Sequence, residues 1–509
     1  MGYEKDLKRV VRDLKNQDAD IRKQAVDWIQ EMVAYTGKVQ VDSAVIQMLA
    51  REAAETFPAS RGEWDDPSFH LVQLAVLFPG SGVEKSLCEF YDGYSPEAKC
   101  LVLAHLAETL EEENWKRLMD LIEQDIQRKR LHLPIPVLIS IPQLATEVIE
   151  THLHQLEEPT CRKELYPLLL FCLNNQYLHR FQPTYLTPLI QQHYREARDV
   201  YLKYDQDYQM RHVYGPWKET YLDVRAHLLE MLNLLEYYYT DTSETFLKEA
   251  LGFRDPVVRT GAIIASLQRN LPVEASLIEE SATHIETSLM TWWELVRIHQ
   301  EHRHPIPLEK RQPYFAKTYA FDQVWTESDF YLEEIYIKAS VEPTEWFETK
   351  VRYYLAKAVI NGEAKPMWIG GFPLEDEDGA EYTDASVIWD EPYQDGEEEP
   401  YQKRLLEEWD AKQKEWAEHV YYENTNLFGE TFRIQAGNVT LTTKKSTQTV
   451  RILDIRTVQQ KKTFLKTTLQ IETKEKTVLQ VPTSLIDYRV LEMILTHITG
   501  NLKEQPVFM

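Results

Sequence analysis

The stretch Asp255–Ala262, with the sequence Asp-Pro-Val-Val-Arg-Thr-Gly-Ala, contains the helix start around which the N-terminal part of the chain is organised. Asp255 can cap a new helix, and Pro256 fits the first helical turn. The valines and alanines that follow at helical spacing supply a buried side of small residues. Arg259 is then placed to reach a neighbouring helix. We expect the stretch to open the second helix of a helical hairpin.

Weaker copies of this pattern recur along the chain, each with a basic residue three positions before a small or apolar one. The central basic residues are Arg22, Lys99, Arg162, Arg225 and Arg259, at intervals of 77, 63, 63 and 34 residues. The shortest interval is near the length of one helical-hairpin repeat, and the others are compatible with pairs of degenerate units. The chain between them is helical in pattern and punctuated by prolines, with very little strand character.

The unit resembles the second helix of a HEAT repeat, in which an acidic cap, a valine-arginine pair and a small residue let stacked helices pack closely. The resemblance to HEAT-like or armadillo-like proteins implies a mainly α fold, an irregular α-solenoid over residues 1–362, with a concave face for a partner. The structural repeat positions are Arg22, Arg162, Arg225, Asp255 and Arg259. We expect these arginines to bridge adjacent hairpins.

Composition and charge limit the class of partner. The chain has 509 residues, 43% of them hydrophobic, which is enough for large cores. It carries 82 acidic and 56 basic residues, a formal charge of -26. Such a field repels the phosphates of nucleic acids and anionic lipids over most of the surface. We therefore expect protein partners that are neutral or basic, and no nucleic acid.

The sequence favours a cytoplasmic protein. Its four cysteines lie in apolar helical contexts without a C-x-x-C pair, which is typical of buried free thiols in a reducing compartment. No apolar run approaches the length of a membrane-spanning helix, and the charged N-terminus does not resemble a signal peptide. The lipidation motifs are absent as well. The oligomeric state is open.

Residues 363–400 differ in character from the rest, with 13 acidic residues against Lys365 alone. We interpret them as an acidic linker or flap, because such charge runs usually stay solvated. Aromatic residues within the run support an alternative, in which Trp368, Phe372 and Trp389 anchor a docking segment. That segment would fold back on the protein or engage a basic ligand.

The C-terminal region reads as a connecting helix over 401–428 followed by a small α+β module over 429–509. Short threonine-rich and β-branched runs predict strands at 431–435, 439–443, 449–453, 455–459, 464–472 and 477–481, and one helix closes the chain. This order, with Arg451–Val458 in its middle, resembles a pleckstrin-homology-like or GRAM-like domain. Members of that family bind phosphoinositides, peptides or proteins.

The module is basic although the chain is acidic. Residues 431–509 hold twelve basic and six acidic residues, so the module is +6 and the rest is -32. Candidate partner- or lipid-binding residues are Lys444, Lys445, Lys461 and Lys462. These lysines predict one of two surfaces: a face that binds an anionic membrane or partner, or an internal docking site for the acidic segment. We favour the internal docking site, because a tethered segment has a high effective concentration.

No catalytic or metal-binding motif is evident. His299 and His302 are three residues apart, whereas a helical metal pair is four apart, and His304 is next to a helix-ending proline. Phosphate-binding loops and nucleophile elbows are absent. We expect no catalytic residues, no metal and no cofactor. The one argument for an enzyme is that some HEAT-like repeat proteins are DNA glycosylases or bilin lyases, which use side chains on a concave face. Tryptophans of this chain could supply such a face.

These observations predict a non-catalytic protein-binding scaffold or adaptor. A peripheral membrane adaptor that binds anionic lipid through the C-terminal module is the alternative. A HEAT-repeat enzyme, glycosylase-like or lyase-like, comes third.

Overall fold

The computed structural model describes most of the chain. The described residues are 2–35, 42–62, 64–78, 82–109, 111–178, 185–209, 213, 218–326, 330–342, 351–374, 387–396, 398–426, 428–462 and 467–498. They form two compact units, Met1–Tyr194 with Asn233–Tyr238, and Arg195–Leu232 with Tyr239–Met509.

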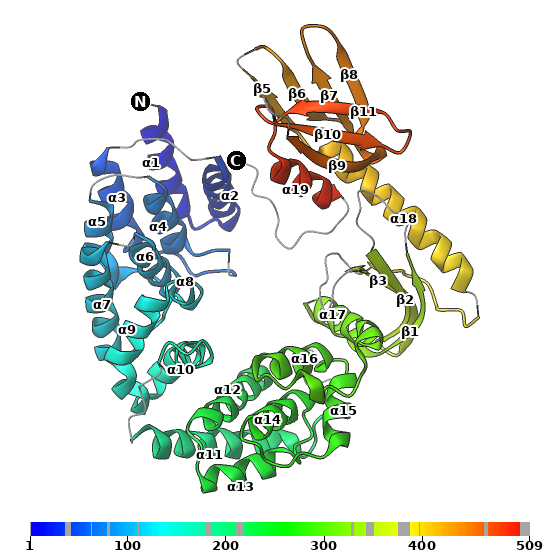
Figure 1. Cartoon of the computed structure of the whole chain (residues 1–509). Helices are drawn as coiled ribbons and strands as arrows, with labels where there is room; N and C mark the ends of the chain where they lie inside the picture. The colour runs from blue at the N-terminus through cyan, green and yellow to red at the C-terminus, as the bar shows by residue number, and fades with distance from the viewer. Residues whose placement is uncertain are drawn as a thin grey trace. The chain divides into compact units, whose positions relative to one another are not determined.

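The first unit is built of helices joined by short connections (Figure 1). They are α1 (Gly2–Leu14), α2 (Ala19–Tyr35), α3 (Ser43–Ala53), α4 (Pro67–Leu77), α5 (Val83–Phe90), η1 (Tyr91–Gly93), α6 (Pro96–Glu108), α7 (Glu112–Gln127), α8 (Ile135–Ser140), α9 (Pro142–His152), η2 (Leu153–Glu157) and α10 (Pro159–Asn174). Leucine, valine and alanine side chains at helical spacing fill the space between them. The helical character predicted for this part of the chain is confirmed.

Further helices begin the second unit. They are α11 (Leu186–Asp205) and α12 (Lys218–Tyr237), which each contribute residues to both units, then α13 (Asp241–Ala250), α14 (Pro256–Gln268), α15 (Ala275–Thr283), α16 (Ser288–Arg297), η5 (Glu301–Arg303), η6 (Leu308–Lys310) and α17 (Gln312–Thr326). Helix α14 starts as predicted, because Asp255 Oδ1 accepts hydrogen bonds from the backbone N–H of Val257 at 2.8 Å and of Val258 at 3.1 Å. Gly261 lets α14 approach α12 closely, since a Cβ there would lie 2.3 Å from Leu229 Cδ1.

After α17 the chain forms a four-stranded antiparallel sheet in the order β1-β2-β3-β4. The strands are β1 (Leu332–Val341), β2 (Val351–Ile360), β3 (Glu363–Pro373) and β4 (Val387–Ile388). The prediction of helices up to residue 362 is therefore wrong for 332–341 and 351–360, and residues 343–350 lie outside the described residues. The linker prediction for 363–400 is wrong where β3, β4 and the start of α18 are described. Residues 375–386 and 397 of that segment lie outside the described residues.

The sheet was missed because helices cover both of its faces. Helix α17 packs on β1 and β3, and α18 (Glu398–His419) packs on β1 and β2. Along β2, Tyr353 and Leu355 belong to the core shared with α18, while the ring of Tyr354 contacts that of Phe372. A strand buried on both sides lacks the polar-apolar alternation that marks a half-exposed strand, and its composition resembles that of a buried helix.

The C-terminal module contains two antiparallel sheets and a closing helix (Figure 1). One sheet has the order β5-β6-β7-β8 and the other β11-β10-β9. Their strands are β5 (Tyr422–Thr425), β6 (Thr431–Gln435), β7 (Asn438–Thr442), β8 (Thr447–Arg451), β9 (Ile455–Lys462), β10 (Thr467–Thr473) and β11 (Val478–Pro482), with η7 (Ile452–Asp454) between β8 and β9 and α19 (Tyr488–Ile498) at the end. The six predicted strands are confirmed to within a few residues, but β5 lies inside the predicted connecting helix.

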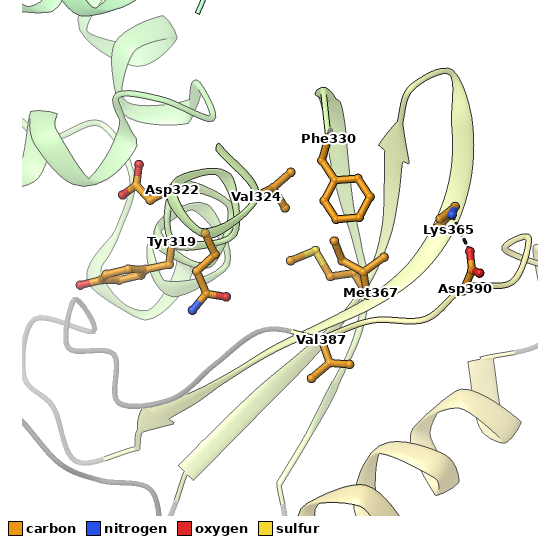
Figure 2. A pocket seen from close by; sticks show the side chains of 10 residues that line it. Tyr319, Asp322, Val324, Phe330, Lys365, Met367, Val387 and Asp390 are labelled. Carbon is orange, nitrogen blue, oxygen red and sulfur yellow. Dashed lines mark hydrogen bonds and ion pairs between the residues drawn. The ribbon is translucent and has the colours of Figure 1, made fainter. Parts of the chain in front are cut away.

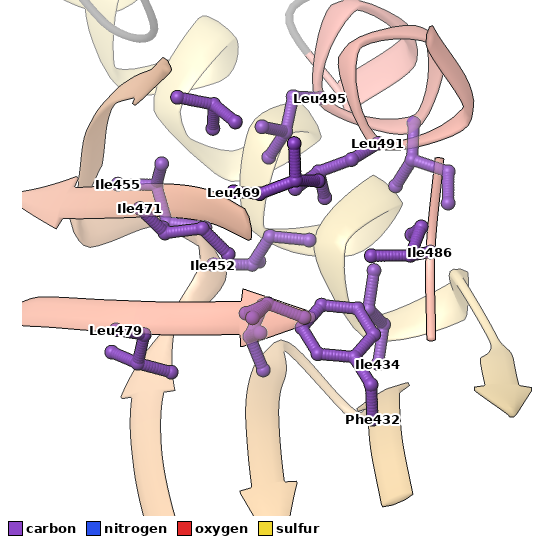
Figure 3. Packing of buried hydrophobic residues seen from close by; sticks show 14 of the residues in the cluster. Phe432, Ile434, Ile452, Ile455, Leu469, Ile471, Leu479, Ile486, Leu491 and Leu495 are labelled. Atoms are coloured by element: carbon purple, nitrogen blue, oxygen red, sulfur yellow. The ribbon is translucent and has the colours of Figure 1, made fainter. Parts of the chain in front are cut away.

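One apolar core joins both sheets of the module to α19 (Figure 3). Phe432 and Ile434 enter it from β6, and Leu469 enters it from β10. Leu491 and Leu495 of α19 close it on one side, as Figure 3 shows. Ala417 and Val420, from the end of α18 and the residue after it, belong to the same core. Helix α18 therefore packs on the first sheet with its N-terminal half and on the module with its C-terminal end.

Hydrogen exchange distinguishes this fold from an electrostatic dock of the acidic segment. We expect the backbone amides of β3 between Ala364 and Phe372 to exchange slowly both at low salt and at 1 M salt, because antiparallel pairing with β2 protects them. An electrostatic dock would lose protection at 1 M salt, where the Debye length is about 3 Å. Exchange that becomes fast only at high salt would contradict the sheet.

Candidate functional site

Arg22, the first of the recurring basic residues, is buried in an ion pair. Its Nε and Nη2 donate to the two carboxylate oxygens of Asp65 at 2.8 and 2.6 Å. Both side chains are nearly inaccessible to solvent. The guanidinium also donates to the backbone carbonyl of Asn16 at 2.8 Å. This pair connects α2 to the segment before α4, and the hydrogen bond from Arg22 lowers the pKa of Asp65.

Arg225 lies between two buried carboxylates in the second unit. Its Nη1 is 2.9 Å from Glu286 Oε2 and 3.6 Å from Asp255 Oδ2. The hydroxyl of Tyr221 donates to Asp255, and that of Tyr208 donates to Glu286 at 3.3 Å. Burial raises the pKa of Glu286, and the Arg225 charge opposes that shift. The network connects α12, the cap of α14 and the segment between α15 and α16.

Arg259 and Arg162 make more exposed or more local contacts. Arg259 of α14 pairs with Glu280 of α15, whose side chain is 54% exposed. Arg162 donates to the backbone carbonyls of Leu156 at 3.1 Å and Glu157 at 3.3 Å, just before its own helix. These contacts agree with a structural role for the repeat positions. Their contribution to stability remains a prediction.

The three aromatic residues proposed as docking anchors are buried inside the sheet layer. Trp368 and Phe372 belong to β3, and Trp389 follows β4. Trp389 Nε1 donates to Glu408 of α18 at 2.9 Å, and Trp368 Nε1 donates to the same carboxylate at 3.3 Å. The Arg404 guanidinium lies 4.4 Å from the centre of the Trp389 ring. Trp368 and Trp389 hold the sheet on α18, and Phe372 packs against Tyr319 of α17, so none of the three is available to an external ligand.

A hollow of about 890 Å³ lies between α17 and the strands β3 and β4. In Figure 2, Val324 and Phe330 face Met367 across it, and Val387 lies below them. The full lining is Tyr319, Asp322, Gln323, Val324, Phe330, Lys365, Met367, Val387, Ile388 and Asp390. Its volume is within the range of small-molecule and side-chain binding pockets, and its floor is mainly apolar.

Carboxylates border this hollow. Asp390 accepts a hydrogen bond from Lys365 Nζ at 2.8 Å, drawn as a dashed line in Figure 2. Asp322 has no hydrogen bond or ion pair with any described residue. Its carboxylate reaches solvent, but the surrounding protein displaces enough water to raise its pKa to about 6. The hollow therefore combines an apolar floor with a carboxylate that has no cationic partner.

A second hollow of about 470 Å³ adjoins the first, and Lys365 and Asp390 line both. Glu363, Glu391 and Tyr393 also line it. Glu391 pairs with Arg404 at 3.0 Å, whereas Glu363 has no ion pair with a described residue. Because they share Lys365 and Asp390, we call the two hollows together the α17 groove. Four carboxylates and one lysine line it.

The four candidate lysines divide between the two sheets of the C-terminal module. Lys444 and Lys445 lie in the turn that joins β7 to β8, and Lys461 and Lys462 end β9. The β5–β6 connection lies at the same end of its sheet as the β7–β8 turn, because the strands are antiparallel. That connection exposes 72% of Phe428. An apolar tip and two lysines therefore share one end of the four-stranded sheet.

The described residues give no support to metal or thiol chemistry. They contain no group of three or more side chains arranged to hold a metal ion. Cys161 and Cys172 are buried, Cys88 and Cys100 are partly exposed, and all four are free. Burial raises the pKa of Cys100 and of Cys172 to about 11, which keeps these thiols protonated and unreactive.

Comparison with known proteins adds no family. Neither the family models, the curated proteins nor the solved structures contain a match to this chain. In the described part of the chain, no helix has both the length and the apolar character that crossing a membrane requires.

The α17 groove was not predicted, because its residues are far apart in sequence. Its walls come from α17, β3 and β4, and two of these were assigned to a linker. The acidic composition of 363–400 correctly indicated a concentration of carboxylates in this segment. Composition alone does not show which of them line a common hollow. The exposure of Phe428 was not predicted either, because this residue was assigned to the end of the connecting helix over 401–428, whereas it lies between β5 and β6.

Proposed function

We propose that the protein is a non-catalytic protein-binding scaffold, with HEAT-like helical hairpins followed by a pleckstrin-homology-like module. The observation that carries the proposal is the α17 groove, an apolar hollow of about 890 Å³ bordered by carboxylates. Its described lining contains no serine, cysteine or histidine that could act as a nucleophile with an adjacent base. A groove of this kind is suited to binding a partner.

The elements on either side support the two proposed architectures. In the helical part, an aspartate caps α14, Gly261 permits close helix packing, and Arg259 contacts the next helix, as expected for a HEAT-like unit. In the module, a four-stranded sheet is followed along the chain by a three-stranded sheet and one helix, which is the order expected for a pleckstrin-homology-like domain. Both folds serve mainly as binding platforms, although fold alone does not assign a ligand.

Affinity capture tests the scaffold proposal. The full chain is immobilised and exposed to its native lysate, with heat-denatured chain as the control, and bound material is identified by mass spectrometry. We expect at least one protein that is neutral or basic to be enriched on the native chain alone. Recovery of nucleic acid without protein, or of nothing above the control, would contradict the scaffold.

A second candidate function, binding to an anionic membrane, is favoured by Phe428 and the lysines beside it. An exposed aromatic residue can enter the interface while each nearby lysine adds about 1 kcal/mol of attraction to an anionic surface. This arrangement supports a peripheral adaptor that uses the β5–β6 and β7–β8 connections. The side chain of Lys462 lies outside the described residues, so the argument rests on Lys444 and Lys445.

Liposome sedimentation of the full chain measures this candidate. If the module serves a membrane, vesicles with anionic lipid should sediment the protein and neutral vesicles should not. Replacing Lys444, Lys445, Lys461 and Lys462 together by Glu should abolish sedimentation, and Phe428→Ser should weaken it without changing its salt dependence. Unchanged binding of the quadruple variant would exclude this face as the membrane-binding surface. The absence of binding to any vesicle would exclude the membrane adaptor and leave only the scaffold proposal.

A further inference from the structure

We propose that the α17 groove binds a basic peptide segment of the partner, with a large apolar side chain in the hollow and flanking Lys or Arg side chains against the rim. This inference rests on the proposed scaffold function and names the chemistry of its partner. The groove lies within the second unit, and its walls are parts of α17, β3 and β4 that pack on one another.

The apolar floor determines the first part of the proposal. Val324 is 2% exposed and Met367 is 1% exposed, so both are held in place by the surrounding core. Phe330, Val387 and Ile388 are only partly buried, and each has surface left to cover. Removing that surface from water is favourable by about 25 cal/mol per Å². One large aliphatic or aromatic side chain is the simplest group that does so.

The charges of the rim determine the second part. Asp322 lies on the α17 side of the groove, and Glu363 and Asp390 lie on the sheet side. Lys365 pairs with Asp390 at 2.8 Å and interacts more weakly with the charge of Glu363, so one lysine faces several carboxylates. A cationic group beside Asp322 would offset the loss of water contact that raises the pKa of this carboxyl to about 6. An anionic ligand would instead add a like charge to the rim.

The net charge of the chain favours the same sign of charge. The chain as a whole has a formal charge of -26. Long-range attraction therefore favours the approach of a basic segment and repels an acidic one.

The spread of the lining residues favours a peptide over a compact small molecule. The two hollows share the Lys365–Asp390 pair, and Asp322 lines the larger one while Glu363 lines the smaller one. Neither Asp322 nor Glu363 forms an ion pair with a described residue. A segment with one apolar anchor and cations on each side can contact both hollows at once, which a single small cation cannot.

Selection from a random peptide library on phage tests the inference without a known partner. The full chain is the target, and selected peptides are synthesised and measured by fluorescence anisotropy. We expect enriched sequences to contain a large apolar residue with Lys or Arg on both sides. The double variant Asp322→Asn with Glu363→Gln should weaken their binding about five-fold, since each surface ion pair contributes up to about 1 kcal/mol.

Controls separate the groove from general charge effects. Asp410→Asn removes one charge from an exposed position of α18 outside the groove and should leave binding unchanged. Val387→Arg places a cation in the hollow and should abolish binding, with circular dichroism to check folding. Enriched peptides without basic residues, peptides that bind the double variant as tightly as the natural chain, or no enrichment at all would overturn the inference.

The two proposals fail in different ways. If the double variant captures the same lysate proteins as the natural chain, the scaffold stands and the groove is not its peptide site. If lysate capture fails but library peptides bind the groove in the expected manner, the peptide chemistry stands and the scaffold proposal does not.

Discussion

Replacing Arg225 by alanine should lower the free energy of unfolding by about 3–5 kcal/mol, the range measured when one partner of a buried ion pair is removed. The guanidinium is 13% exposed and lies between the buried carboxylates of Asp255 and Glu286. Without it two carboxylates share an apolar site, with only neutral donors left: the hydroxyls of Tyr208 and Tyr221 and the backbone N–H groups that Asp255 caps. Urea unfolding followed by circular dichroism measures the loss.

Two comparisons identify the buried charges as the cause. Arg259→Ala removes the same side chain type from a pair whose carboxylate is 54% exposed, and should cost about 1 kcal/mol or less. Adding Glu286→Gln to Arg225→Ala should recover part of the loss, because it removes one of the two unpaired charges. Equal losses for Arg225→Ala and Arg259→Ala would show that burial of the network does not determine stability.

The loss should also depend on pH. Burial raises the pKa of Glu286 above its unfolded value, and removal of Arg225 raises it further. A carboxyl with a raised pKa in the folded state destabilises the fold at high pH and ceases to do so once it is protonated. The difference between the variant and the natural chain should therefore shrink as the pH falls from 8 to 5. A constant difference would indicate lost packing alone.

Local chemistry made the helices and the C-terminal strands predictable. The Asp255 cap is visible in the sequence because an aspartate before a proline has few other roles at a helix start. The bounds of β6 at Thr431–Gln435 match the prediction because this strand has one buried face and alternates buried and exposed residues. In both cases the residues that determine the structure are neighbours in sequence.

The sheet β1–β4 and the α17 groove depend on contacts between distant segments. Trp368 and Trp389 were assigned to a solvated or docking segment because of the carboxylates around them. In the fold, both indoles donate to Glu408 of α18, a carboxylate outside that segment, which is part of the core contact. Net charge along the chain cannot distinguish such a residue from one in solvent. The two cases differ in whether the carboxylate is buried, and composition does not report burial.

Gly370→Ala should be destabilising by about 2–3 kcal/mol, a cost typical of overpacking a well-filled core. Gly370 of β3 is paired with Tyr353 of β2, and a Cβ at this position would lie 1.6 Å from Tyr353 Cδ1. The Tyr353 ring is buried, and its centre is 5.3 Å from that of Trp368, so it has little room to move. Urea unfolding monitored by tryptophan fluorescence gives the change.

The sign of the change in unfolding free energy shows whether Gly370 lies in a sheet or in a linker. In a solvated tether, Gly→Ala is neutral or stabilises by about 0.4–1 kcal/mol through the unfolded chain. Gly252→Ala is the matched control, since the nearest atom to its added Cβ is the Glu249 carbonyl oxygen at 3.3 Å. In a Tyr353→Ala background the ring is gone, so Gly370→Ala should add little further loss. A full additional loss in that background would mean that the clash with Tyr353 is not what requires glycine at this position.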